Sequence, residues 1–70
     1  MKVCDLIYKM LDHHVDIVIT EYKGISRIMR SCVIEKYSND YTNVPEDIWN
    51  AEVDMIMPSC DQFRIWIQAK

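Results

Sequence analysis

The sequence predicts an α+β fold for one domain over residues 1–70: an N-terminal helix packed on a small, mostly antiparallel sheet of about four strands, with a short helical turn before the last hairpin. The spacing of apolar residues changes after His14 from a helical repeat to a two-residue repeat. Ten isoleucines and six valines outnumber two leucines, and β-branched side chains favour strands. A chain of 70 residues is long enough for one domain and too short for two.

The first segment has the pattern of an amphipathic helix. Its apolar residues fall at positions i, i+3, i+4, i+7 and i+8, which places them in one stripe: Val3, Leu6, Ile7, Met10 and Leu11. Asp5 near the start and the pair His13-His14 at the end carry the charges that a helix dipole favours at each position. We therefore expect a helix that runs up to the two histidines.

The next segment has the pattern of a β-hairpin. Apolar and polar residues alternate over residues 15–20 and again over residues 25–30, with an extension through Ile34 left open. Between them lies Gly24, the only glycine in the chain, which tolerates the backbone angles of a tight turn. The two strands are therefore predicted to be antiparallel neighbours.

The rest of the chain is predicted to form a loop, a short helix and a second hairpin. Residues 35–44 are polar and read as a surface loop. Pro45 followed by two acidic residues is typical of a helix start. Alternation over residues 53–57 and 63–68 predicts the last two strands. The order of the strands in the sheet stays open.

Composition narrows the classes of function. The net charge of −3 gives no electrostatic reason to approach a phosphate backbone. No apolar run reaches the roughly 20 residues needed to cross a bilayer, and an acid at position 5 argues against a signal peptide. We therefore expect a cytoplasmic protein without a membrane partner. The three cysteines have neither disulfide nor zinc-site spacing and are expected to be reduced.

Three groups of residues could in principle carry chemistry. The adjacent pair His13-His14 would point about 100° apart on a helix, so a shared metal ion is disfavoured. Cys4 near a helix start has no partner histidine at a recognisable spacing. Glu52 and Asp54 would share one strand face, but a solvated face explains them equally well. The sequence therefore predicts a protein that is not an enzyme and uses no metal or cofactor.

Trp66 is the strongest candidate for a binding residue. On the last strand it alternates with the apolar set of Phe63, Ile65 and Ile67, so it falls with Arg64 and Gln68 on the opposite face. Tryptophan is enriched at the centres of protein interfaces. Val18 and Ile28 are expected on the same face, which would create an apolar patch there. The alternative is that Trp66 merely covers this second face of the sheet.

A second candidate is a basic strand. Its cationic residues, with tyrosines at both ends, could contact single-stranded nucleic acid: Lys23, Arg27, Arg30 and Lys36. The stretch lacks the glycine–aromatic signature of ribonucleoprotein motifs, and the net charge is negative. Pairing of these cations with Asp16 and Glu21 across the hairpin is the plainer role. Nucleic-acid binding is therefore the alternative reading.

Several segments together resemble a class of known proteins. They are the runs 3–7, 15–19, 45–49 (Pro-Glu-Asp-Ile-Trp), 51–53 (Ala-Glu-Val) and 63–67 (Phe-Arg-Ile-Trp-Ile). The pattern resembles short uncharacterised proteins of phages, prophages and related mobile elements in low-GC bacteria, with a longer middle over residues 31–43. The resemblance implies no established activity and no catalytic residues. It implies a bacterial or phage-infected host, where such accessory proteins bind larger ones, including defence proteins such as CRISPR effectors.

The sequence as a whole favours a non-enzymatic protein-binding module. Its partner is expected to be another protein of unidentified type, and inhibition of a host factor is the sharpest form of this hypothesis. A second copy of the chain is an alternative partner, because a domain this small gains stability from association.

Overall fold

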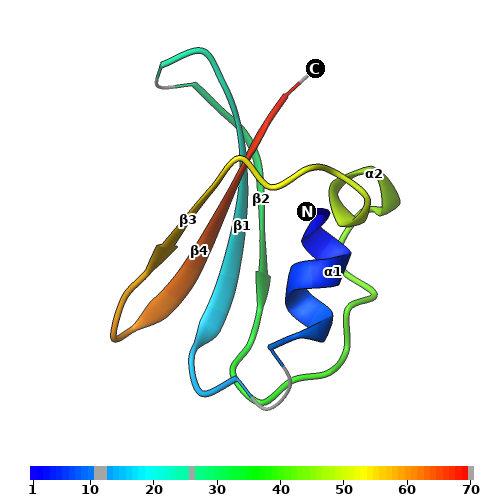
Figure 1. The fold of residues 1–70 in the computed structure, drawn as a ribbon, viewed down its shortest axis with the longest axis vertical. Helices are drawn as coiled ribbons and strands as arrows, with labels where there is room; N and C mark the ends of the chain where they lie inside the picture. Colours follow the sequence, from blue (N-terminus) through cyan, green and yellow to red (C-terminus); the bar gives the residue numbers. More distant parts are fainter. Residues whose placement is uncertain (11–12, 26, 70) are drawn as a thin grey trace.

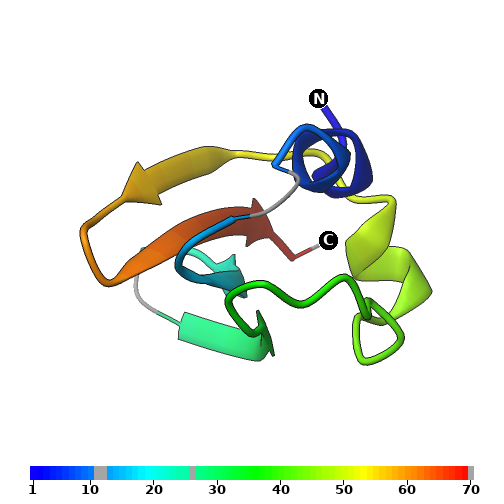
Figure 2. The same ribbon diagram turned by 90° about the horizontal axis from the view of Figure 1, so that it is seen from below.

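A computed structural model describes residues 1–10, 13–25 and 27–69. Two helices and four strands follow one another along the described chain: α1 (Val3–Tyr8), β1 (Asp16–Lys23), β2 (Arg27–Ile34), α2 (Glu46–Trp49), β3 (Met55–Pro58) and β4 (Gln62–Gln68). Both helices lie on one side of the sheet, and its other face is left open (Figures 1 and 2). The predicted α+β architecture is confirmed.

The sheet has the order β2-β1-β4-β3. Each hairpin is antiparallel, as predicted, with β1 paired to β2 and β3 paired to β4. The two hairpins join through their inner strands, because β1 runs parallel to β4 with Ile19 opposite Ile65. This central pair buries its inner face under the helices, with Ile17 and Ile19 of β1 beside Ile65 and Ile67 of β4.

The core lies between the central strands and the helices. Its largest fully buried side chains come from every layer of the fold: Val3 and Ile7 of α1, Ile17 and Ile19 of β1, Ile34 of β2, Ile48 of α2, and Ile65 and Ile67 of β4. Seven of these eight residues are isoleucine, so the excess of isoleucine in the sequence is the core itself. The predicted stripe of the first helix supplies two of them, and Leu6 and Met10 pack against the cluster.

The first helix is shorter than predicted. It ends at Tyr8, so the expectation that His13-His14 close the helix was wrong; Leu11 and Asp12 lie outside the described residues. The His13 ring is instead buried, with Nδ1 2.8 Å from the Val15 carbonyl oxygen and Nε2 3.0 Å from the Ser38 carbonyl oxygen. His13 ties the entry of β1 to the loop after β2.

Two backbone features complete the fold. Gly24 has φ +69° in the β1–β2 turn, which is the conformation that its place in the sequence predicts. The segment after α2 runs beside the N-terminus, where the Val3 N–H donates to the Ala51 carbonyl (2.9 Å) and the Val53 N–H donates to the Met1 carbonyl (2.8 Å). These bonds hold α1 against the second half of the chain. Among the described residues, no helix has both the length and the apolar character to span a membrane.

Candidate functional site

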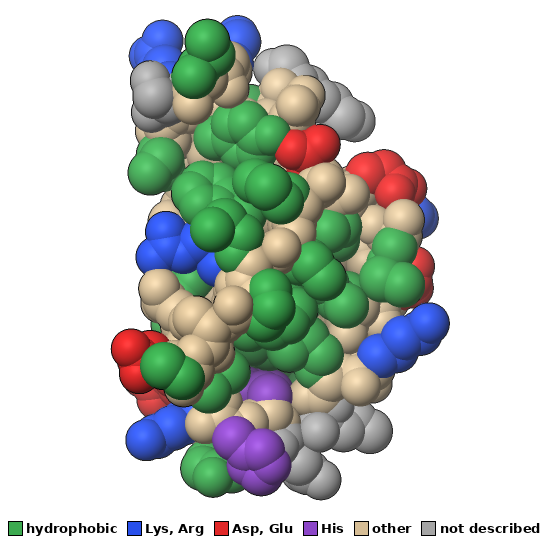
Figure 3. All heavy atoms as spheres, turned by 60° about the vertical axis from the view of Figure 1, so that its left-hand side comes forward, with side chains coloured by type: hydrophobic (Ala, Val, Ile, Leu, Met, Phe, Trp, Pro, Cys, Tyr) green, Lys and Arg blue, Asp and Glu red, His purple; other side chains and the backbone are tan. Residues whose placement is uncertain are grey.

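The face of the sheet that carries no helix is here called the open face. The strand register alternates a fixed set of side chains onto it: Val18, Thr20 and Tyr22 of β1; Ile28, Ser31 and Val33 of β2; Met55 and Met57 of β3; Arg64, Trp66 and Gln68 of β4. The four residues singled out by the protein-binding hypothesis, Trp66, Arg64, Val18 and Ile28, all belong to this set. Figure 3 views the molecule from this side, and hydrophobic side chains gather along its long axis.

Trp66 lies in the middle of the open face and is half-buried. Its Nε1–H donates to the Met57 sulfur at 3.2 Å, and the Tyr22 ring meets it edge-on at 5.8 Å between centroids. The Arg64 guanidinium carbon lies 5.5 Å from the centre of the indole ring, a cation–π distance. Trp66 is therefore braced by its neighbours while part of the ring still meets solvent.

Around Trp66 the open face is apolar and accessible. Tyr22, Ile28, Met55 and Trp66, together with Ile25 from the turn, line a hollow of about 380 Å³. The exposed fraction is 59% for Ile28, 50% for Met57 and 46% for Met55. Apolar side chains this exposed and this close together are typical of a surface that another molecule covers.

Arg64 is the cation of this surface, and it makes no ion pair within the described part of the chain. The two carboxylates at the borders already accept hydrogen bonds, Asp16 from the Lys36 backbone N–H at 2.8 Å and Asp54 from the Tyr22 hydroxyl. The bond to Asp54 raises the pKa of Tyr22, because losing the phenolic proton would leave two anions in contact. Arg64 is thus available to an anion from outside.

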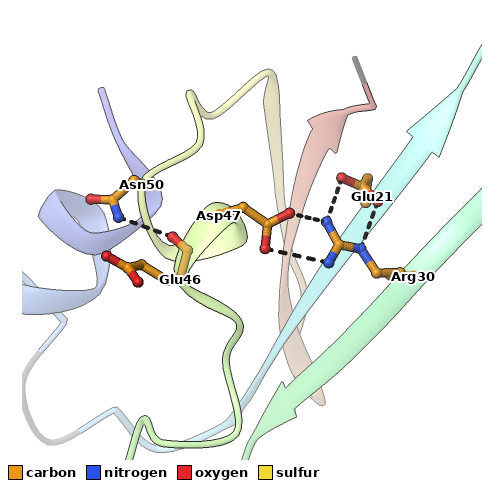
Figure 4. A network of polar contacts seen from close by, with 5 residues as sticks. All are labelled: Glu21, Arg30, Glu46, Asp47 and Asn50. Carbon is orange, nitrogen blue, oxygen red and sulfur yellow. Dashed lines mark hydrogen bonds and ion pairs between the residues drawn. The ribbon is translucent and has the colours of Figure 1, made fainter.

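The four cations of the nucleic-acid hypothesis are not gathered on one face. Lys23 and Arg27 lie opposite each other at the hairpin end of the sheet, whereas Lys36 follows the far end of β2. Arg30 projects to the helix side, where its guanidinium donates to Glu21 at 2.9 and 3.0 Å and also bonds Asp47 (Figure 4). One of the four is therefore occupied by the protein's own carboxylates.

The Arg30 contacts join the sheet to α2. The two bonds to Glu21 form a bidentate pair across the β1–β2 hairpin, the cross-strand role that the sequence suggested for these cations. The contact with Asp47 reaches the first turn of α2 and lowers the pKa of that carboxyl, since the ionised form is the one that accepts the bond. This cluster holds the short helix in place.

The other chemical candidates lie apart from one another. Glu52 pairs with the N-terminal ammonium at 2.9 Å and Asp54 bonds Tyr22; both precede β3, so the prediction that they share a strand face was wrong. Cys4 and Cys32 are half-buried and Cys60 is exposed, all as free thiols. Burial raises the pKa of the Cys32 thiol, which disfavours the reactive thiolate. Within the described ranges, His, Cys, Asp and Glu side chains form no group of three that could hold a metal ion.

A further hollow, of about 770 Å³, lies between α2 and the sheet. Four carboxylates line it, from Glu21, Asp47, Glu52 and Asp54. Each is engaged by a partner of its own: Arg30 for the first two, the N-terminus for the third and Tyr22 for the fourth. All four carboxylates therefore make bonds within the chain itself.

Sequence reasoning missed three open-face residues that lie around Trp66. Met55, Met57 and Tyr22 surround Trp66, but their meeting depends on the β3–β4 register and on the parallel β1–β4 pair. Alternation within each strand could have placed each residue on a face. It could not have placed them beside Trp66, because nothing local in the sequence specifies which strands are neighbours.

Comparisons of this chain with protein-family models, with curated proteins and with solved structures found no match.

Proposed function

We propose that this protein is a non-enzymatic binding module that docks on another protein through the open face of its sheet. The observation that carries the proposal is the exposed apolar cluster around Trp66, with Met57 and Ile28 at its sides. The helix layer buries the inner face of the central strands, whereas no element of the described chain covers this outer face. A partner would supply the missing layer.

Charge supports a particular kind of partner. The Arg64 guanidinium sits over the indole of Trp66 and makes no ion pair with a carboxylate of residues 1–10, 13–25 or 27–69. Burying it under an apolar surface would leave a desolvated charge without a partner, which is costly. The surface that fits is therefore apolar at its centre and carries a carboxylate placed to meet Arg64, which then forms a charge-assisted hydrogen bond.

A second copy of the chain fits this face less well. Two open faces stacked about a two-fold axis would each present Arg64, and the carboxylates at the borders, Asp16 and Asp54, each already use one oxygen in a hydrogen bond within the chain.

The proposal is tested by photo-cross-linking to find the partner, followed by a charge swap between Arg64 and the partner. A photo-cross-linking residue replaces Met57 on the open face, or Glu35 as a matched exposed position outside it, and the captured host protein is purified and its contact surface mapped. We expect capture from position 57 only.

Arg64→Glu should weaken binding of the purified partner by ten-fold or more, and Glu→Lys or Asp→Lys at the facing position of the partner should restore it.

Two results would contradict the proposal. Binding that is indifferent to both Arg64→Glu and Met57→Lys would place the contact elsewhere. A solution mass of two chains, reverting to one in Met57→Lys, would show that the open face is covered by a second copy. Arg27→Glu is the matched charge reversal, because Arg27 is exposed, pairs with Lys23 at the hairpin end and does not line the hollow around Trp66.

The cellular setting forms part of the same proposal. A host protein in the cytoplasm, such as a defence factor that is inhibited by being covered, is the partner that the sequence pattern suggests. A captured protein whose activity survives saturation by this module would remove the inhibitory part and leave the docking surface standing.

A further inference from the structure

A cluster of three aromatic side chains lies in the helix layer, away from the open face. Tyr41 of the loop before α2 stacks on Trp49 at the end of α2, with ring centroids 5.3 Å apart and planes 27° apart. Tyr8 at the end of α1 meets both rings edge-on, at 5.5 Å from Trp49 and 6.4 Å from Tyr41. Tyr8 is 57% exposed, and the other two rings are half-buried. The cluster is therefore an aromatic surface that solvent reaches.

This surface is hollowed and carries negative charge. The three rings line a shallow hollow of about 420 Å³ together with two carboxylates, Asp40 and Glu46; the remaining lining residues are Asn39, Thr42 and Val44. Among the described residues, no lysine or arginine lines this hollow. The negative faces of the rings and the carboxylates thus act in the same direction, in favour of a cation.

Both carboxylates have free acceptor capacity in the described part of the chain. Asp40 uses Oδ1 for the Thr42 backbone N–H (3.1 Å) and hydroxyl (2.7 Å), which leaves Oδ2 open. These two bonds lower the pKa of Asp40, so its charge persists at neutral pH. In Figure 4 the Glu46 carboxylate points away from Arg30, to the side on which α1 lies. Only the backbone oxygen of Glu46 is engaged, by Asn50 at 2.9 Å.

We propose that this hollow binds the guanidinium group of an arginine side chain presented by a partner polypeptide. A guanidinium is flat and stacks on an aromatic ring, and its fork of N–H donors matches a carboxylate. Asp40 and Glu46 flank the rings, so a stacked guanidinium can donate to either. The site is distinct from the open face and does not depend on the function proposed for it. Its rings and Glu46 come from α1, α2 and the loop before α2, and both helices lie on the other side of the sheet (Figure 2).

The test uses the intact protein and a blocked arginine, N-acetyl-argininamide, in an NMR titration. The indole N–H of Trp49 reports on the hollow, and that of Trp66 serves as an internal reference on the open face; Trp49→Phe assigns the two signals. We expect a saturable shift of the Trp49 signal alone, with a dissociation constant on the order of millimolar. N-acetyl-citrullinamide, the neutral isostere, should bind at least about five-fold more weakly.

Variants separate charge at the site from charge in general. Asp40→Asn with Glu46→Gln should weaken binding of the probe, and Asn keeps the oxygen that accepts the Thr42 bonds. Glu35→Gln with Asp61→Asn removes the same charge from exposed positions that do not line the hollow and should leave binding unchanged.

Several results would overturn the proposal. These are equal binding of the citrulline and arginine probes, no saturable shift of Trp49 up to tens of millimolar, and a shift that survives in the Asp40→Asn, Glu46→Gln protein. Tighter binding of free arginine than of the blocked probe would exclude a polypeptide ligand. The citrulline comparison needs no variant, so the proposal stays testable if the double variant does not fold.

Discussion

Two isoleucines that lie opposite each other across the β3–β4 pair have very different surroundings. Ile65 is fully buried under the helices, whereas Ile56, on the same side of the sheet, is 46% exposed because β3 extends past the helix layer. Ile65→Ala should lower the free energy of unfolding by about 2–5 kcal/mol through lost burial and a cavity. Ile56→Ala should cost less than about 1 kcal/mol. Urea denaturation measures both.

Ile65→Val is a milder substitution that allows positions 65 and 56 to be compared even if Ile65→Ala does not fold. A 70-residue domain has roughly 4–10 kcal/mol of stability in total, so Ile65→Ala alone can come close to unfolding it. Ile65→Val should cost about 0.5–1.5 kcal/mol. Equal losses at positions 65 and 56 would mean that β3 is packed as tightly as the centre of the sheet, contrary to the exposure of Ile56.

Alternation along a strand predicts on which face of the sheet a side chain lies, but it does not predict which side chains surround it. The face of Trp66 follows from its phase relative to Ile65 and Ile67, and the register places it there. The contact of its Nε1–H with Met57 could not be predicted, because it depends on where the β3–β4 turn begins. The burial of His13 was also missed, since its ring contacts backbone carbonyls, which every residue has.

The helix α2 is only four residues long and is fastened to the sheet by the bond from Arg30 to Asp47. This bond lowers the pKa of Asp47 below the value of about 3.9 expected in the unfolded chain. Between the two pKa values the unfolded chain binds more protons, so acid favours unfolding. The contribution is complete above about pH 5 and is lost as the pH falls through the lowered pKa of Asp47.

Asp47→Asn should therefore lower the urea midpoint at pH 6 and make its decline between pH 5 and pH 3 shallower. Asp40, whose pKa is also lowered, adds a dependence of the same sign in both proteins and cancels in the comparison. Asp61→Asn is the matched control, since Asp61 is exposed and outside the contacts of Arg30. Parallel pH profiles for Asp47→Asn and the unmodified protein would show that Arg30 does not hold α2.

Each hairpin was predictable because its signals are local. Gly24 lies between two alternating runs, and the short helix was correctly placed after Pro45. The end of α1 was misjudged, because apolar spacing continues past Tyr8 although the helix does not. A glycine after the last turn is the usual sequence signal for a helix end, and α1, with Lys9 at its C-cap, ends without one.

The molecule is assembled by pairing its two halves. In every β1–β4 pair the two residues lie 46 positions apart in the sequence, as Asp16 and Gln62 do. No local pattern encodes such a pair, which is why the strand order stayed open in the sequence. Neither hairpin has a complete core, because the buried face of β1 needs the buried residues of β4 and α2 beside it.

A fragment of residues 1–43 should therefore lack a folded sheet. It retains Ile17, Ile19 and Ile34 but loses Ile48, Ile65 and Ile67 from the core. Isolated two-stranded hairpins are marginal in water. Circular dichroism and the dispersion of amide NMR signals, with the intact chain as reference, measure this directly. A well-dispersed spectrum from the fragment would mean that the N-terminal hairpin and helix form a stable unit alone.

The outer strands bear on aggregation. β3 has four residues and ends in Pro58, which has no N–H to offer a neighbouring strand. β2 is longer, but a register shift opposite Glu21/Tyr22 interrupts it, arginines occupy positions 27 and 30, and Asn43 Nδ2 donates to the Val33 carbonyl oxygen at 2.8 Å. Bulges, charges and proline are the devices by which sheets avoid growing into fibrils. The protein can therefore expose the apolar open face although its edge strands, β2 and β3, do not favour pairing with strands of further chains.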